Sequence, residues 1–252
     1  MLLTGKTCLI TGGGTGIGRA TALRFVEEGA SVWIVGVDVD SLRRTAAEIG
    51  PDCLWRPGDV TKQEQLQPVV DEIPQLDVLV SNAAVSYAVD LLSDPLDRWR
   101  EMFEVNMWGG VLACRAAGQK MIRQGKGGRI IIISSILSGT ADPGNTPYAM
   151  AKAALNQLGR QLAVEWAEYG ILVNVIAPGW VHTPMSYVTG SNELESDSFK
   201  QFFVNPSRPR LPLMRPAASE EVAEAVLFFA NPRNSYCTGS VLVVDGGLTI
   251  RL

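Results

Sequence analysis

The sequence predicts an α/β fold, a single-domain doubly wound (Rossmann-type) sheet of mainly parallel strands with helices on both faces. Short apolar runs alternate with longer helical stretches along the chain, a pattern that favours right-handed crossovers between parallel strands. The apolar runs are nearly continuous in Val, Ile and Leu, as in strands that are covered on both faces. A chain of 252 residues with 46% hydrophobic residues can form one such unit with a large core.

Apolar runs give six expected strands, at Thr7–Thr11, Ser31–Val35, Val78–Val80, Arg129–Ile133, Ile171–Ile176 and Val241–Val244. A further strand is expected just before Asp59. The expected helices are Gly18–Glu28, Asp40–Ile49, a stretch around Leu96–Gln124, Tyr148–Glu168 and Ala218–Phe229. We expect residues 1–252 to form one domain.

The segment at about 185–215 departs from this alternation. It is polar and irregular, yet it contains Tyr187, Phe199, Phe202 and Phe203 and several prolines. Long insertions inside a compact domain are usually functional or disordered. We expect a lid over the strand ends, with a plain disordered loop as the alternative.

Composition excludes several classes of function. A net charge of -4 argues against a nucleic-acid or anionic-membrane partner, and no apolar run approaches the length of a membrane helix. The N-terminus has no charged leader followed by an apolar stretch, which predicts a cytoplasmic chain. The four scattered cysteines are expected in the core. With His182 as the single histidine, we expect no metal site and no Ser-His-Asp triad.

A glycine-rich turn follows the first expected strand and leads directly into a helix. Its sequence is Thr11-Gly12-Gly13-Gly14-Thr15-Gly16-Ile17-Gly18. Glycines let backbone N–H groups approach a pyrophosphate at a positive helix N-terminus, and the strand before and helix after strengthen that interpretation. The candidate cofactor-binding residues are Gly12, Gly14, Thr15, Gly16, Ile17 and Gly18. The alternative is a tight turn without a ligand.

The Thr-Gly-x-x-x-Gly-x-Gly spacing resembles the short-chain dehydrogenase/reductase family, in its short single-domain type. Further motifs extend the resemblance along the chain: Asp59-Val60, Ser81-Asn82-Ala83-Ala84, the segment from Asn174 through Pro178-Gly179 to Met185, and Val244-Asp245-Gly246-Gly247. The second motif departs at two of four positions from the usual Asn-Asn-Ala-Gly. The resemblance implies that Asp59 and Val60 hold adenine, that Asn82 lies beside the ribose, and that Pro178, Gly179, Val181 and Thr183 meet the nicotinamide.

Ser135, Tyr148 and Lys152 are the candidate catalytic residues, together with Asn106. Tyr148 and Lys152 are four residues apart and share a helix face. A tyrosine has a pKa near 10, and an adjacent ammonium, aided by the positive nicotinamide, moves it toward the working range. The resemblance implies that Tyr148 exchanges a proton with the substrate oxygen, that Ser135 stabilises this oxygen, that Lys152 holds the nicotinamide ribose, and that Asn106 orders a water. A Tyr-x-x-x-Lys pair alone also arises by chance.

The end of the second strand bears on the choice between NAD and NADP. NAD-dependent relatives usually carry an acidic residue at the position of Gly36, and NADP-dependent ones a basic residue at Val37, Gly14 or Thr15. The chain has neither, while Asp38 would repel a 2′-phosphate. We expect NAD to be preferred over NADP.

The candidate substrate residues are Ser135, Tyr148, Asn145, Trp180 and Tyr187. A mostly apolar lining favours a bulky or cyclic secondary alcohol or ketone, with sugar alcohols and acyl thioesters left open. The competing hypotheses are an inactive dinucleotide-binding regulatory subunit and an NADP-dependent ketone or acyl reductase. The resemblance also implies a homotetramer or homodimer built through the two long helices.

Overall fold

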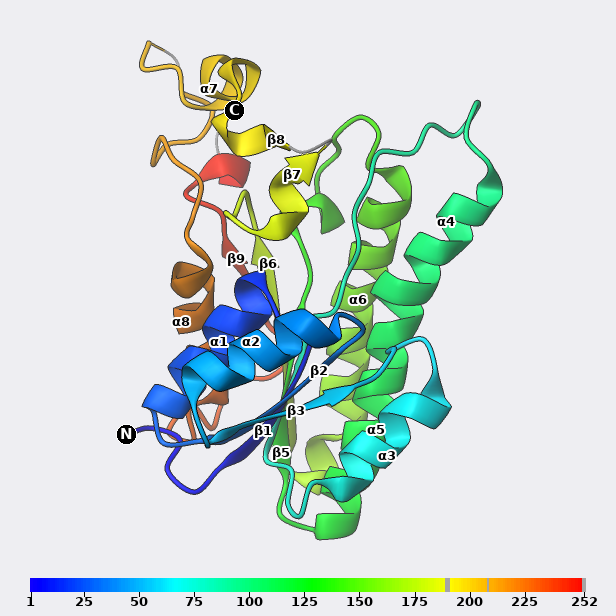
Figure 1. Ribbon diagram of the computed structural model, residues 1–252, viewed down its shortest axis with the longest axis vertical. Helices are drawn as coiled ribbons and strands as arrows, with labels where there is room; N and C mark the ends of the chain where they lie inside the picture. The colour runs from blue at the N-terminus through cyan, green and yellow to red at the C-terminus, as the bar shows by residue number, and fades with distance from the viewer. Residues whose placement is uncertain (189–190, 208, 251–252) are drawn as a thin grey trace.

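The computed structural model describes residues 1–188, 191–207 and 209–250, without the side chains at 187, 188 and 191. Within them, seven parallel strands form one sheet in the order β3-β2-β1-β4-β5-β6-β9 (Figure 1). The strands are β1 (Thr7–Thr11), β2 (Ser31–Gly36), β3 (Cys53–Pro57), β4 (Val78–Ser81), β5 (Gly128–Ile133), β6 (Ile171–Pro178) and β9 (Val241–Val244). The predicted sheet of parallel strands is confirmed. Strand order reverses beside β1, so the turns after β1 and β4 flank the crevice where such sheets bind ligands.

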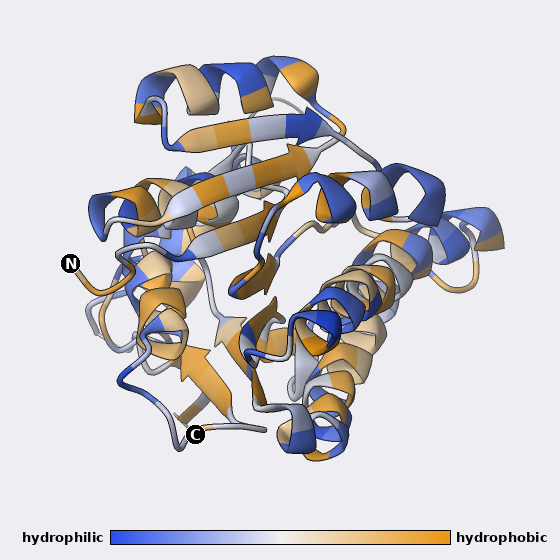
Figure 2. Cartoon of the chain, turned by 90° about the horizontal axis from the view of Figure 1, so that it is seen from below, coloured by the Kyte–Doolittle hydropathy of each residue, from blue (hydrophilic) through white to orange (hydrophobic). Residues whose placement is uncertain are grey.

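Helices cover both faces of the sheet, each with its own apolar core. Helices α1 (Gly16–Glu27), α2 (Val39–Ile49) and α8 (Ser219–Ala230) pack on one face, and α3 (Gln63–Glu72), α5 (Gly109–Gln124) and α6 (Thr146–Glu165) pack on the other (Figure 1). In Figure 2 the strands are mainly orange, while the helices carry both colours. This is the pattern of strands buried on both sides beneath amphipathic helices. Among the described residues, no helix is long and apolar enough to cross a bilayer.

Two helical regions differ from the sequence prediction. Helix α3 was missed because only Leu66, Val69 and Val70 are buried in it and Pro68 lies inside it, which gives a weak periodic signal. The long helix expected around Leu96–Gln124 is divided into α4 (Leu96–Phe103), a π-helical turn η1 (Glu104–Trp108) and α5. Such π turns occur frequently at functional sites.

The segment after β6 forms short, defined elements. They are η4 (Pro184–Ser186), the antiparallel pair β7 (Tyr187–Val188) and β8 (Ser191–Asn192), η5 (Glu193–Glu195) and α7 (Asp197–Phe203). In Figure 1 this segment lies at the top, beside the C-terminus. The backbone N–H of Leu211 donates to the carbonyl of Phe203 (2.9 Å), and that of Leu213 donates to the carbonyl of Gly246 (3.2 Å). The segment is therefore attached to the turn after β9.

Helix α6 lies unusually close to the sheet at Gly159. A Cβ added there would lie 2.5 Å from Cγ2 of Val175 in β6. Glycine at this position permits the helix to approach the strands that carry the candidate site, at a cost in helix propensity.

We predict that Gly159→Ala lowers the free energy of unfolding by about 1 kcal/mol, because overpacking of 1–3 kcal/mol exceeds a gain in propensity of about 1 kcal/mol. Urea denaturation measures this change. Gln157→Ala, at an exposed position of the same helix, is the control and should change stability by less than about 0.5 kcal/mol. A more stable Gly159→Ala variant would show that the helix does not require this close approach.

Candidate active site

The glycine-rich turn connects β1 to α1 at the crevice. Gly12 has a φ of +64°, and a Cβ added to Gly18 would lie 2.2 Å from the carbonyl oxygen of Gly12. The chain folds back here so closely that a side chain at either position would strain or block it.

The N-terminus of α1 is open to an anion. Thr15 is its N-cap residue but makes no side-chain capping bond, and the first turn carries no acidic side chain. The first N–H groups of a helix have no partner within the helix and attract negative charge. This combination fits the pyrophosphate of a dinucleotide. Ile17 lies in the same first turn, and Gly14 accepts a hydrogen bond from the Thr45 hydroxyl at 2.9 Å.

The expected nicotinamide-side residues lie next to this turn. Pro178 ends β6, and Val181 is buried after it. Thr183 lies against the turn, since a Cβ added to Gly16 would be 3.1 Å from its Cγ2. Gly179 donates from its backbone to the carbonyl of Val244 in β9 (2.9 Å). The structure thus brings the loop after β6 and the glycine-rich turn after β1 together.

Asn82 ties the turn after β4 to the turn after β1. Its Nδ2 donates to the carbonyl oxygens of Thr11 (2.9 Å) and Gly12 (3.1 Å). The Thr11 hydroxyl in return accepts from the backbone N–H groups of Asn82 (2.9 Å) and Ala83 (3.0 Å). Both amide hydrogens of Asn82 are engaged, so this side chain positions the glycine-rich turn. Its predicted place beside the ribose stays a prediction.

Asp38 and Asp59 each form a local cap at the end of a strand. The carboxylate of Asp38 accepts from the Ser41 backbone (3.1 Å) and hydroxyl (2.6 Å) at the start of α2. The Ser41 hydroxyl, followed by the Ser41 N–H, lowers the pKa of Asp38. Asp59 accepts from the Thr61 backbone (2.9 Å) and hydroxyl (2.8 Å), while the neighbouring Val60 is buried. Both carboxylates lie where the adenosine end of a dinucleotide is expected, and both also stabilise the local backbone.

Ser135, Tyr148 and Lys152 come together at the carboxyl end of β5. Ser135 follows the strand, and its hydroxyl faces Tyr148 on α6, where it lowers the pKa of the tyrosine. The Nζ atom of Lys152, one helical turn further, donates to the carbonyl of Ile133 (2.9 Å) and lies 5.4 Å from the centre of the Tyr148 ring. Ser134 donates its hydroxyl to the carbonyl of Lys152 (3.0 Å). The turn after β5 and the start of α6 are therefore fixed against each other.

Burial dominates the electrostatics of this group. Desolvation raises the pKa of Tyr148 to about 12, although the hydrogen bond from Ser135 lowers it. Desolvation also lowers the pKa of Lys152 to about 7. The sequence predicted a lowered tyrosine pKa with the positive nicotinamide beside it, and that stays a prediction. In the chain without cofactor the pKa is raised, since Lys152 donates to a backbone carbonyl and burial disfavours its charged form. A bound nicotinamide would add positive charge beside Tyr148 and lower this pKa.

Asn106 is buried in the π-helical turn η1. Its Oδ1 accepts from the backbone N–H of Val85 (3.0 Å), and its Nδ2 donates to the carbonyl of the same residue (2.8 Å). The amide therefore holds the segment that follows β4. The water-ordering role that the resemblance implies stays a prediction.

The remaining substrate candidates contact different parts of the chain. Asn145 precedes α6 and donates to the carboxylate of Asp142 (2.7 Å). Trp180 instead packs on the segment beyond β6, with its ring centre 5.5 Å from that of Phe199 and 5.4 Å from that of Phe203. The side chain of Tyr187 lies outside the described residues.

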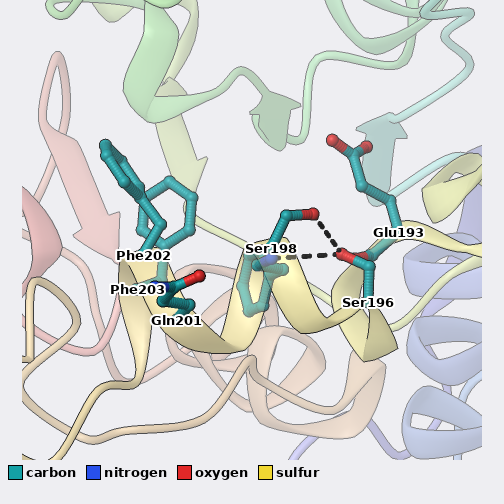
Figure 3. A pocket seen from close by; sticks show the side chains of 7 residues that line it. Glu193, Ser196, Ser198, Gln201, Phe202 and Phe203 are labelled. Carbon is teal, nitrogen blue, oxygen red and sulfur yellow. Dashed lines mark hydrogen bonds between the residues drawn. The ribbon is translucent and has the colours of Figure 1, made fainter.

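A cavity of about 520 Å³ lies against α7 (Figure 3). Its lining residues are Glu193, Ser196, Ser198, Phe199, Gln201, Phe202 and Phe203. Figure 3 shows Phe202 and Phe203 toward one end of α7, with Ser196 and Glu193 at the other. The sequence analysis singled out the phenylalanines but not the polar lining residues. These lie in η5, at the N-cap of α7 and in α7 itself, in a segment whose polar, irregular sequence gives no helical pattern.

Comparison with known proteins identifies the family. Residues 12–249 match the family model described as enoyl-(acyl carrier protein) reductase. The chain is 35% identical to the 3-oxoacyl-(acyl-carrier-protein) reductase of Thermotoga maritima, over 99% of this chain and 100% of that protein. It is 35% identical to the cis-4-hydroxycyclohexanecarboxylate dehydrogenase of Sinomonas cyclohexanicum, over 97% of this chain and 96% of that protein. A solved structure of a short-chain dehydrogenase/reductase family protein matches with a TM-score of 0.86 at 34% identity. The match covers 99% of this chain and 100% of that one.

The chain belongs to the short-chain dehydrogenase/reductase family. It is an oxidoreductase that uses a nicotinamide cofactor to interconvert an alcohol and a ketone.

We predict that the stability difference between the wild type and Lys152→Met depends on pH in the cofactor-free protein. The pKa of Lys152 is about 7 when folded and near 10.4 when unfolded, so the unfolded chain binds more protons between these values. Wild-type stability relative to Lys152→Met therefore rises with pH, by about 2 kcal/mol between pH 7 and pH 9. Urea denaturation at a series of pH values measures it, and a constant difference would contradict the lowered pKa.

Proposed function

We propose that this enzyme oxidises a fairly apolar or cyclic secondary alcohol, or reduces the corresponding ketone, with Tyr148 as the acid/base. The observation that carries the proposal is the buried group at the end of β5. The Ser135 hydroxyl faces Tyr148 there, and Lys152 is fixed beside the tyrosine ring. An inactive regulatory subunit would have no use for a buried lysine beside a half-buried tyrosine, with the pKa values of both displaced.

In the proposed reaction Tyr148 Oη donates its proton to the ketone oxygen, or accepts the proton of the alcohol. The Ser135 hydroxyl hydrogen-bonds the same oxygen and stabilises the charge that develops on it. Lys152 holds the nicotinamide ribose, and the open N-terminus of α1 holds the pyrophosphate. The nicotinamide, when bound, supplies or accepts the hydride. In this scheme Tyr148 alone supplies the proton to the ketone oxygen.

We propose NAD as the preferred cofactor. The residue after β2 that would face a 2′-phosphate is Val37, whose side chain is 74% exposed and uncharged. The lowered pKa of Asp38 keeps a negative charge beside it. Arg43 lies near Asp40 (3.8 Å) on α2, and Arg44 donates to the Ser41 hydroxyl (3.1 Å). Both guanidinium groups thus have partners on the helix, which supports NAD over NADP.

We propose that the segment at about 185–215 is a lid over the substrate. Trp180 directly follows the Pro178-Gly179 motif, and its contacts with Phe199 and Phe203 attach α7 to the predicted nicotinamide loop. The cavity beside α7 has none of Ser135, Tyr148 and Lys152 in its lining, so the proposal rests on the aromatic contacts of Trp180. A relative named for cis-4-hydroxycyclohexanecarboxylate supports a cyclic alcohol as the substrate.

We also propose that the protein works in the cytoplasm as a homodimer or homotetramer. Apolar side chains are exposed along the two long helical regions, at Leu96 and Trp108 on one and at Met150 and Val164 on the other. Contact with a second subunit would cover these side chains. The four cysteines are free thiols, as expected in a reducing compartment.

Tyr148→Phe tests the proposed function. We expect it to keep NADH binding and to lower turnover of secondary alcohols at least about 10²-fold, because only the proton donor is lost. Fluorescence titration with NADH and a screen of cyclic alcohols, ketones and acyl thioesters measure both quantities. Tyr169→Phe, at an exposed tyrosine, is the control and should leave both unchanged. Undiminished turnover in Tyr148→Phe would refute the assignment, and turnover of thioesters alone would favour the acyl reductase.

Val37→Arg tests the cofactor preference. The added guanidinium would offer a bidentate partner to a 2′-phosphate, so we expect the ratio of NADPH to NADH affinity to rise about tenfold or more. Val37→Gln has a long polar side chain without the charge and should leave the ratio near that of the wild type. If the wild type already binds NADPH more tightly, the NAD proposal is wrong.

A further inference from the structure

The turn that carries Ser135 is held from behind by a second serine. Ser135 is the N-cap of the 3₁₀ turn η2 (Ile136–Ser138), and its carbonyl accepts from both the hydroxyl (2.5 Å) and the backbone N–H (3.0 Å) of Ser138. The Ser138 hydroxyl in turn accepts from Nδ2 of Asn156 on α6 (2.8 Å). A chain of hydrogen bonds therefore runs from α6 through Ser138 to the backbone of Ser135.

Asn156 continues the stripe of α6 that carries the candidate catalytic residues. Tyr148, Lys152 and Asn156 are spaced by four residues, so they lie on one face of the helix. Each contacts the end of β5 or the turn after it: Tyr148 at the Ser135 hydroxyl, Lys152 at the Ile133 carbonyl and Asn156 at Ser138. The third contact fixes the end of η2 that the other two leave free.

The orientation of the Ser135 hydroxyl depends on this turn. Its Oγ accepts from the backbone N–H of Leu137 (3.2 Å), which leaves its proton to be donated to Tyr148. A shift of η2 would move that N–H and turn the hydroxyl away from the tyrosine oxygen. Holding Ser138 in place therefore holds the Ser135 proton in place.

Asn156 is a costly residue for stability alone. Its Oδ1 is buried and has no hydrogen-bond partner among the described residues. An unpaired buried acceptor costs free energy, and an apolar group of the same shape would remove that cost. The residue therefore supplies something other than stability.

We propose that Asn156 is a positioning residue for catalysis, which holds the Ser135 hydroxyl against Tyr148 by way of Ser138. This inference rests on the proposed function of Ser135 and Tyr148. It makes an unusual prediction, because removing the amide should harm turnover without harming the fold.

The test is Asn156→Leu, with Gln157→Leu at an exposed position of the same helix as the control. We expect Asn156→Leu to lower kcat about five- to tenfold, the effect of one neutral hydrogen bond. Its affinity for NADH should be unchanged, and its Tm equal to or above that of the wild type. Gln157→Leu should keep wild-type kcat. Unchanged kcat in Asn156→Leu, or a loss of kcat that accompanies a lower Tm, would overturn the inference.

A double-mutant cycle separates positioning from a general structural effect. In the Ser135→Ala background, Asn156→Leu should have no further effect on kcat, because the hydroxyl that it positions is gone. Additive losses would overturn the inference. Ser138→Ala should reproduce the loss seen in Asn156→Leu, and Ser138→Thr should restore most of kcat because it retains the hydroxyl.

A measurement without turnover keeps this inference separate from the proposed function. The ¹³Cζ resonance of labelled tyrosine, with NAD bound, reports the ionisation of Tyr148, assigned by comparison with Tyr148→Phe. A weakened hydrogen bond from Ser135 should raise the pKa of Tyr148 in Asn156→Leu and not in Gln157→Leu. An unchanged titration would overturn the inference, whereas failure of the wild type to oxidise any alcohol would overturn the proposed function alone.

Discussion

The structure depends on the contact between the buried Nζ of Lys152 and the Ile133 carbonyl. A buried polar group is tolerated only where it is hydrogen-bonded, so this contact fixes α6 in register with the end of β5. Gly159 allows the helix to lie close enough for the lysine to reach the strand. Tyr148 and Ser135 face each other as a consequence of that register. The close packing at Gly159 and the buried hydrogen bond of Lys152 thus together set the position of α6 on the sheet.

The two halves of the site come from different parts of the sheet and are joined by side chains. The proposed nucleotide half is built by the turns after β1 and β4, which Asn82 ties together. The proposed catalytic half is built by β5 and α6. The loop after β6 links them, since Thr183 lies against Gly16 and Trp180 packs on α7. A dinucleotide that extends from the open N-terminus of α1 toward this loop would therefore lie between segments that hydrogen bonds and packing hold in place.

Much of this arrangement follows from the sequence, because the strongest signals are local. Continuous apolar runs predict the parallel strands, which the structure confirms. The glycine-rich turn predicts a phosphate site, which stays a prediction. The direction of the Tyr148 pKa shift could not be predicted, since it depends on how much water tertiary packing removes. The engagement of Asn82 and Asn106 with backbone groups also could not be predicted, because their partners lie far away in the chain. Helix α3 was missed because one narrow buried stripe with an internal proline resembles a loop.

Desolvation holds Tyr148 protonated until a positive charge is placed beside it. Isothermal titration calorimetry of NAD binding at pH 8, in two buffers of different ionisation enthalpy, counts the protons released and requires no substrate. We predict that the wild type releases a substantial fraction of a proton, because the positive nicotinamide lowers the pKa of Tyr148. Tyr148→Phe should release much less. Equal proton release by the two proteins, or none by the wild type, would contradict the account.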